Sequence, residues 1–226
     1  YEIWNCDWSS DVCSSDLIDE PHFSDADADE IIATIGLPMF VKPANMGSSV
    51  GVRKAKDRAS LLGAIRHAFV YDEWVVCEEA IVGREIEVAV LGNVSPEASL
   101  PGEIVAGAEF YDYEDKYVNA SAQLLIPAVL DADETRIVRE LAVRVYSELR
   151  CEGMARVDFF LESPGRGFLC NEVNTIPGFT PISMYPKMWE VTGLPYAGLI
   201  DRLVELARDR HSRRKRSTQE IGRAHV

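Results

Sequence analysis

Apolar residues recur at helical spacing in four stretches of the chain. Residues 25–35 predict a short helix that ends at Gly36, and a second helix begins after Asp57, a residue suited to capping its first turn. Residues 134–149 and 196–208 predict two longer helices. The apolar sides expected to be buried are Leu61, Ile65, Ala68 and Phe69 in the second helix, Ile137, Val138, Leu141, Val145 and Leu149 in the third, and Leu199, Leu203 and Leu206 in the fourth.

Short apolar or alternating segments between these helices predict strands. They cover residues 39–41, 74–79, 84–91, 103–106 and 123–126. In one of them apolar and polar positions alternate, which predicts a strand with one buried and one polar face. Its apolar face is Ile86, Val88 and Val90, and its other face is Glu85, Glu87 and Ala89. This succession of strands and helices predicts an α+β fold with mostly antiparallel sheets.

Residues 153–178, GMARVDFFLESPGRGFLCNEVNTIPG, predict two strands joined by a tight turn at SPGRG. Side chains two residues apart share one face of a strand, so Arg156 lies beside Asp158. Glu172 and Asn174 share a face in the same way. If the turn closes near Gly165, Asp158 lies opposite Glu172.

Two carboxylates that face each other across a strand pair repel, and a cation between them removes the repulsion. The oxygen atoms of Asp158, Glu172 and Asn174 suit Mg²⁺, which takes one or two carboxylates and completes its shell with water and phosphate. Arg156 beside such a site would meet a phosphate or a developing oxyanion. The turn that follows, Pro-Gly178, can present a backbone N–H there. A surface hairpin with a solvated polar face explains the same residues, and the hairpin alone leaves both interpretations open.

Three further groups fit either nucleotide binding or ordinary surface roles. Lys42 is followed by the small-residue loop GSSVG, which suits a phosphate grip or a simple turn. Glu78 and Glu79 end an apolar strand, where they either accept hydrogen bonds from adenine or ribose or mark the exit to solvent. Lys116 and Tyr117 end a polar, aromatic segment typical of a loop over a site. They either reach a γ-phosphate and a substrate, or are a surface lysine and a packing tyrosine.

The composition excludes several classes of function. With 226 residues, of which 47% are hydrophobic, the chain can bury a core in one or two domains. A net charge of −14 argues against non-specific nucleic-acid binding, and no apolar run is long enough to span a bilayer. The five cysteines form no C-x-x-C pair, which argues against a zinc site or a disulfide framework and favours a cytoplasmic protein.

Both ends of the chain, YEIWNCDWSSDVCSSDL at the start and EIGRAHV at the finish, resemble translated sequencing-adapter sequence. We therefore expect a non-native leader over 1–18, a small lobe over 19–83, a second lobe with the metal site over 84–210, and a basic tail with a non-native end over 211–226. The basic run 210–216 is expected to be a solvated tail after the last helix.

Taken in order, the motifs VKPANMGSSVGV, VVCEEAIVGREIEVAVLGN, EFYDYEDKY and GMARVDFFL…NEVNTIPG resemble the D-alanine–D-alanine ligase family of the ATP-grasp superfamily. The resemblance covers about residues 19–208. It implies an ATP-grasp fold of two α+β lobes that grip ATP. It also implies a cytoplasmic enzyme of peptidoglycan precursor synthesis, in which one D-alanine becomes an acyl phosphate and the amine of a second D-alanine displaces the phosphate.

The resemblance also implies a role for each matching residue. Nucleotide binding falls to Lys42, Ser48, Ser49, Glu78, Ile81, Glu85 and Lys116. Two Mg²⁺ or Mn²⁺ ions fall to Asp158, Glu172 and Asn174. Substrate positioning and transition-state stabilisation fall to Ser48, Tyr117, Arg156, Gly178 and Ser183, with Ser183 binding the carboxylate of the second D-alanine.

Family members carry a separate N-terminal domain, with an H-G-x-x-G-E-D-G-like motif, and a further ATP-binding lysine, neither of which is in this sequence. We therefore expect the chain as given to fold and to bind Mg·ATP but not to ligate D-alanine efficiently, and the parent protein to be a homodimer. Two alternatives stay open: a related ATP-grasp ligase that uses D-lactate or D-serine, and a non-catalytic Mg·nucleotide-binding module.

Overall fold

The computed structural model describes residues 15–47, 49–105, 123–180 and 183–214. The chain divides into two compact units, which are described separately. The first consists of Tyr1–Glu85, Ile104–Gln123 and Phe160–Asn171, and the second of Ile86–Glu103, Leu124–Phe159 and Glu172–Val226.

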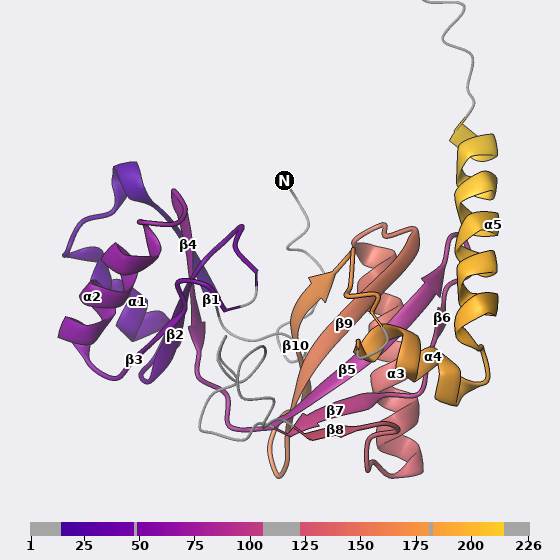
Figure 1. Ribbon diagram of the computed structural model, residues 1–226. Coiled ribbons are helices and arrows are strands. Elements are labelled where there is room, and N and C mark those ends of the chain that lie inside the picture. The colour runs from indigo at the N-terminus through magenta and orange to yellow at the C-terminus, as the bar shows by residue number, and fades with distance from the viewer. Residues whose placement is uncertain (1–14, 48, 106–122, 181–182, 215–226) are drawn as a thin grey trace, which may run out of the picture. The chain divides into compact units, whose positions relative to one another are not determined.

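A four-stranded antiparallel sheet in the order β1-β4-β2-β3 forms the first unit's framework (Figure 1). Its strands are β1 (Ser15–Asp19), β2 (Met39–Pro43), β3 (Arg53–Ala55) and β4 (Trp74–Glu79), and its helices are η2 (Glu20–His22), α1 (Asp27–Ile35) and α2 (Arg58–Ala68). Every second residue of β2 is buried, because one face of the sheet packs against α1 and α2 while the other stays partly open. Lys42 therefore belongs to the partly open face.

Local signals explain where α1 ends and where α2 begins. Gly36 ends α1 with a φ of +86°, a conformation that costs glycine little. Asp57 caps α2 in a reciprocal box, in which its carboxylate accepts from the Ser60 backbone and the Ser60 hydroxyl accepts from the Asp57 backbone. Both ends lie where the sequence predicts them.

The second sheet has six strands, in the order β10-β9-β5-β7-β8, with β6 paired to β5. They are β5 (Arg84–Gly92), β6 (Glu97–Ala98), β7 (Gly102–Val105), β8 (Gln123–Leu125), β9 (Gly153–Glu162) and β10 (Gly167–Asn174). Three helices accompany them: α3 (Ala132–Glu148), α4 (Met184–Thr192) and α5 (Tyr196–Arg214) (Figure 1). The predicted α+β class, with antiparallel pairing, is confirmed.

Buried tyrosines join helices α3 and α4 to the end of β5. The Tyr146 hydroxyl donates to the Gly92 carbonyl at 2.7 Å, and the Tyr185 hydroxyl donates to the Val90 carbonyl at 2.9 Å. Burial raises the pKa of both phenols well above the ordinary value, so they act as neutral donors. These bonds fix the helices on strand β5.

Four expectations are wrong in detail. Strand β5 is buried on both faces from Ile86 onward, because the second face is covered too, so Glu87 is buried rather than solvated. The buried side of α3 is Val138, Ala142, Val145 and Tyr146, while Ile137 and Leu149 are exposed. Residues 15–18, excluded from the fold prediction, belong to the edge strand β1, which pairs through its backbone and needs no apolar alternation.

The fourth correction concerns the basic run 210–216. Helix α5 continues to Arg214, and the arginines of its last turns form ion pairs with Glu152 instead of making a solvated tail.

Among the described helices, none is both long enough and apolar enough to cross a bilayer.

Candidate functional site

Strands β9 and β10 bring four of the predicted residues together. The Arg156 guanidinium donates to both oxygens of Asp158, with Nε–Oδ1 at 2.7 Å and Nη2–Oδ2 at 2.6 Å. The Asn174 amide donates to Asp158 at 3.0 Å and to Glu172 at 3.2 Å. Odd-numbered positions of β9 from Ala155 are buried in the core, so the alternate positions carry this polar cluster.

The charges in this cluster are strongly coupled. Burial raises the pKa of Asp158, the Arg156 guanidinium opposes that rise, and the neighbouring Glu172 carboxylate adds to it. Burial alone would lower the pKa of Arg156, but the Asp158 and Glu87 carboxylates outweigh it and the pKa is raised. Arg156 is therefore a permanent cation, held beside more negative charge than it neutralises.

Glu87 is a member of this cluster that the sequence reasoning missed. It is 4% exposed, and its Oε2 lies 3.4 Å from the Nε of Arg156. The alternation on β5 predicted a polar, solvated face for Glu87. The presence of a glutamate inside such a hydrophobic strand was the one signal that it could be buried beside a cation. Its carboxylate gives Arg156 a second acidic neighbour and so restricts the orientation of the guanidinium.

The donor atoms of this cluster suit a hard divalent cation. The Oδ1 of Asp158 accepts from Arg156 and still offers a lone pair, because an ionised carboxylate has about four acceptor positions, whereas Oδ2 already accepts from both Arg156 and Asn174. Within the described ranges, no three His, Cys, Asp or Glu side chains are grouped so as to hold a metal. A metal here would therefore depend on Asp158, Glu172 and the Asn174 amide oxygen, a set that fits the modest carboxylate requirement of Mg²⁺.

The loop after β10 places Gly178 against Ser183, the residue before the first turn of α4. A Cβ at Gly178 would lie 2.9 Å from the Ser183 hydroxyl oxygen, so a larger residue would displace that hydroxyl. The Ser183 oxygen accepts from the Thr180 backbone at 3.0 Å and lies 2.8 Å from the Thr180 hydroxyl. Tyr196 donates to the Phe179 carbonyl at 3.2 Å, which ties the loop to α5.

The predicted nucleotide residues that the structure describes lie in the first unit. Lys42 and Glu78, diagonal neighbours on the partly open face of the sheet, form an ion pair with Nζ–Oε1 at 2.6 Å. Ser49 takes a φ of +59° in the loop after β2, while Ile81 and Glu85 are half-buried between β4 and the start of β5. Glu79 instead pairs with Arg166 at 2.7 Å, which distinguishes it from Glu78.

Three predicted site residues lie outside the described part of the chain. They are Ser48, Lys116 and Tyr117.

Comparison with known proteins gives consistent matches over most of the chain. Residues 17–205 match the family described as D-ala D-ala ligase C-terminus. A D-alanine–D-alanine ligase of Solibacter usitatus is 55% identical over 178 residues, which cover 79% of this chain and 55% of the relative. One of Sodalis glossinidius is 56% identical over 183 residues, which cover 80% of this chain and 50% of the relative. The chain thus spans about half the length of the curated relatives it matches.

Solved structures agree with these sequence matches. The D-alanine-D-alanine ligase from Coxiella burnetii aligns with a TM-score of 0.79 and 38% identity, over 91% of this chain and 54% of that one. The VanG D-Ala:D-Ser ligase from Enterococcus faecalis aligns with a TM-score of 0.78 and 38% identity, over 87% of this chain and 57% of that one.

Proposed function

Because this chain belongs to the family of the D-ala D-ala ligase C-terminus, we propose that it supplies the ATP-binding and metal-binding part of a ligase that joins two D-alanines. The reaction would convert ATP and two D-alanines to D-alanyl-D-alanine, ADP and phosphate, for peptidoglycan precursor synthesis. The observation that carries this proposal is the cluster of Arg156, Asp158, Glu172 and Asn174, a half-buried cation beside hard oxygen donors.

The residues of the first unit are suited to holding the nucleotide. Lys42 is a point charge on an open sheet face, and a phosphate would replace Glu78 as its partner. Glu78, once released, can accept from the adenine amine. The half-buried Ile81 supplies an apolar surface for the base, and Glu85 can accept from a ribose hydroxyl. Ser49, and by resemblance Ser48 and Lys116, would contact the phosphates.

The residues of the second unit are suited to stabilising developing negative charge. Asp158, Glu172 and Asn174 would hold two Mg²⁺ or Mn²⁺ ions, which would neutralise phosphate oxygens during transfer. Arg156 is fixed by two carboxylates and can donate to an oxyanion without reorganising. The Gly178 backbone N–H supplies a second donor. Ser183, the residue before the first turn of α4, would bind a substrate carboxylate. Tyr117 would help Ser48 to position the first substrate.

Mg²⁺-dependent ATP binding tests this proposal directly. Calorimetry on the 226-residue chain should show ATP binding that requires Mg²⁺ and is lost in Asp158→Asn/Glu172→Gln. The matched control is Asp133→Asn/Glu140→Gln, which removes two exposed acids from α3 and should bind like the wild type. A circular dichroism spectrum must show that all three proteins are folded. A folded wild-type chain without Mg²⁺-dependent binding would overturn the proposal.

A second acceptor is favoured by one observation. The VanG D-Ala:D-Ser ligase aligns as well as the Coxiella burnetii enzyme, with the same 38% identity. The curated relatives are named D-alanine–D-alanine ligases, so we propose D-alanine as the acceptor substrate. ADP release driven by D-alanine, D-serine or D-lactate, measured on a chimera with the preceding half of the Solibacter relative, would separate these acceptors. Selective response to D-serine or D-lactate would contradict the D-alanine assignment.

A further inference from the structure

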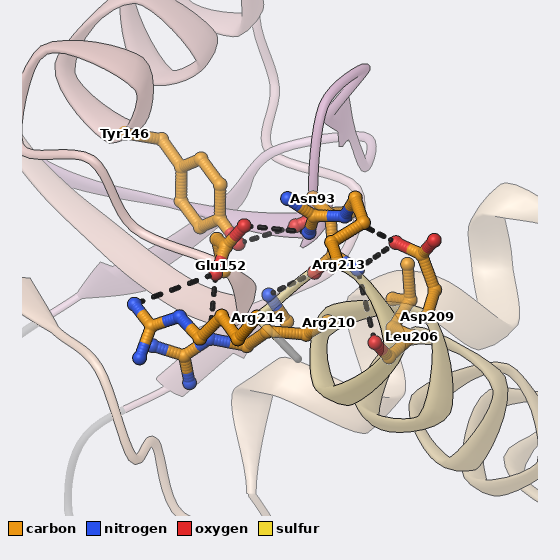
Figure 2. A network of polar contacts seen from close by, with 10 residues as sticks. Asn93, Tyr146, Glu152, Leu206, Asp209, Arg210, Arg213 and Arg214 are labelled. Carbon is orange, nitrogen blue, oxygen red and sulfur yellow. Dashed lines mark hydrogen bonds and ion pairs between the residues drawn. The ribbon is translucent and has the colours of Figure 1, made fainter. Parts of the chain in front are cut away.

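Three arginines of α5 converge on one carboxylate, that of Glu152, just before β9 (Figure 2). The Nε of Arg210 lies 2.5 Å from one carboxylate oxygen, and the Nη2 of Arg213 lies 2.6 Å from the other. Arg214 approaches Glu152 at 3.9 Å. Three cations around one anion leave a surplus of positive charge.

Asn93, in the turn after β5, holds this arrangement in place. Its amide donates to the Leu206 carbonyl at 2.9 Å and to Asp209 at 2.7 Å, and its oxygen accepts from the Gly153 backbone at 3.1 Å (Figure 2). The side chain thus ties α5 to the ends of β5 and β9. Because these contacts fix the helix, the arginines are held close together despite their repulsion.

The surplus of positive charge persists when the other charged neighbours are counted. Asp209 pairs with Arg213 at 3.0 Å and offsets one cation. Within the cluster the guanidiniums of Arg210, Arg213 and Arg214 therefore still outnumber the carboxylates of Glu152 and Asp209, in a chain whose net charge is −14. Such a local reversal of sign attracts anions that the rest of the surface repels.

A cavity lies beside this cluster and is large enough for a small anion. Its volume is about 340 Å³, and Arg210, His211 and Arg214 line it together with apolar residues of α5. A water occupies about 30 Å³ in the liquid, so a tetrahedral oxyanion fits with part of its hydration shell. Arg210 engages Glu152 through Nε, and its terminal Nη groups can donate to an anion in the cavity.

We propose that this cavity is a binding site for a small phosphate-class dianion, held by the guanidinium groups of Arg210 and Arg214 beside Glu152. Guanidinium groups bind phosphate oxygens through paired, charge-assisted hydrogen bonds. Glu152 competes with the dianion for the same cations and so weakens its binding. None of these residues belongs to the set assigned to ATP or its metal, so the site is separate from the proposed function.

Inorganic phosphate is the probe for this site, with sodium chloride of equal ionic strength as the reference. The thermal unfolding of the 226-residue chain should shift upward with phosphate, in a saturable way. Arg210→Gln/Arg214→Gln should weaken the apparent affinity by about tenfold or more, since each removes charge-assisted bonds. Glu152→Gln should tighten it, because the competing carboxylate is gone. A purely structural role for the arginines predicts no phosphate effect in any variant.

Two controls separate this site from other anion sites on the chain. Lys42→Gln removes the cation assigned to ATP phosphates. Added to Glu152→Gln, it should leave the phosphate-induced rise in the unfolding temperature unchanged. Arg136→Gln removes an exposed arginine of α3 and should respond like the wild type. The proposal is overturned if phosphate acts no differently from chloride, if the response survives in Arg210→Gln/Arg214→Gln, or if Lys42→Gln abolishes it.

Discussion

Arg156 and Asp158, two residues apart on β9, form a bidentate ion pair in which both nitrogen–oxygen distances are below 2.8 Å. The pair is mostly buried, and Glu87 and Glu172 add negative charge around it. Such a pair contributes little net stability compared with apolar residues, yet removing one partner leaves a buried charge uncompensated. The arrangement thus fixes the orientation of the Arg156 guanidinium without adding much to the stability of the fold.

Replacing Arg156 should destabilise the chain far more than replacing a surface arginine. We expect Arg156→Met to lower the free energy of unfolding by about 3–5 kcal/mol, because Asp158 would lose its partner. Arg136→Met, which breaks an exposed pair on α3, should have a much smaller effect, because water already screens that pair. Urea unfolding followed by circular dichroism measures both. Adding Asp158→Asn to Arg156→Met should recover much of the loss, and equal losses for the two arginine variants would contradict this account.

Lys42 should contribute to nucleotide affinity through its charge. In the structure it neutralises Glu78, and we expect ATP phosphates to take over that role. Lys42→Met should therefore weaken Mg·ATP binding by about tenfold or more, in line with the loss of a charge-assisted hydrogen bond. Lys56→Met, at an exposed position after β3, is the matched control and should bind normally. Calorimetric affinities that are equal for the two variants would remove Lys42 from the nucleotide site.

Burial, rather than pairing, controls the reactivity of Cys77. The thiol is fully buried on β4, and desolvation, helped by the Asp16 and Glu78 carboxylates, raises its pKa to about 12. Almost no thiolate forms near pH 8, so iodoacetamide should leave Cys77 unmodified in the native chain and alkylate it readily in urea. Mass spectrometry of the Cys77 peptide reads the difference. Rapid labelling of the native protein would mean that β4 opens easily.

Much of the fold could be predicted because its signals are local. Asp57 and Gly36 mark helix ends through capping and backbone conformation, which depend on a few neighbouring residues. The SPGRG turn fixed the β9–β10 hairpin, and residues two apart on each strand then had to share a face. The clustering of Arg156, Asp158, Glu172 and Asn174 follows from that geometry alone.

What could not be predicted depends on contacts between distant segments. Whether Glu87 faces solvent or the half-buried Arg156 depends on what covers the second face of β5. Helix α4 was missed although Met184, Tyr185, Met188 and Trp189 recur at helical spacing, because the helix has only nine residues and a proline stands in its first turn. The arginines after residue 209 looked like a solvated tail, since nothing in the sequence pairs them with Glu152, some sixty positions earlier.

Glu152 should make the stability of the chain depend on pH in a predictable direction. A hydrogen bond from Arg213, against a smaller opposing effect of burial, lowers its pKa below the ordinary value of 4.5. An acid whose pKa is lowered by folding stabilises the folded state above the unfolded pKa, and this contribution is lost as the pH falls through the folded pKa. In phosphate-free buffer at pH 7, the wild type should therefore be more stable than Glu152→Gln, and the difference should shrink steadily below about pH 4.5. Urea unfolding at a series of pH values measures it, with Glu140→Gln on the exposed side of α3 as the control. A gap between wild type and Glu152→Gln that stays constant down to the acid transition would show that the ion pairs of Glu152 do not hold α5.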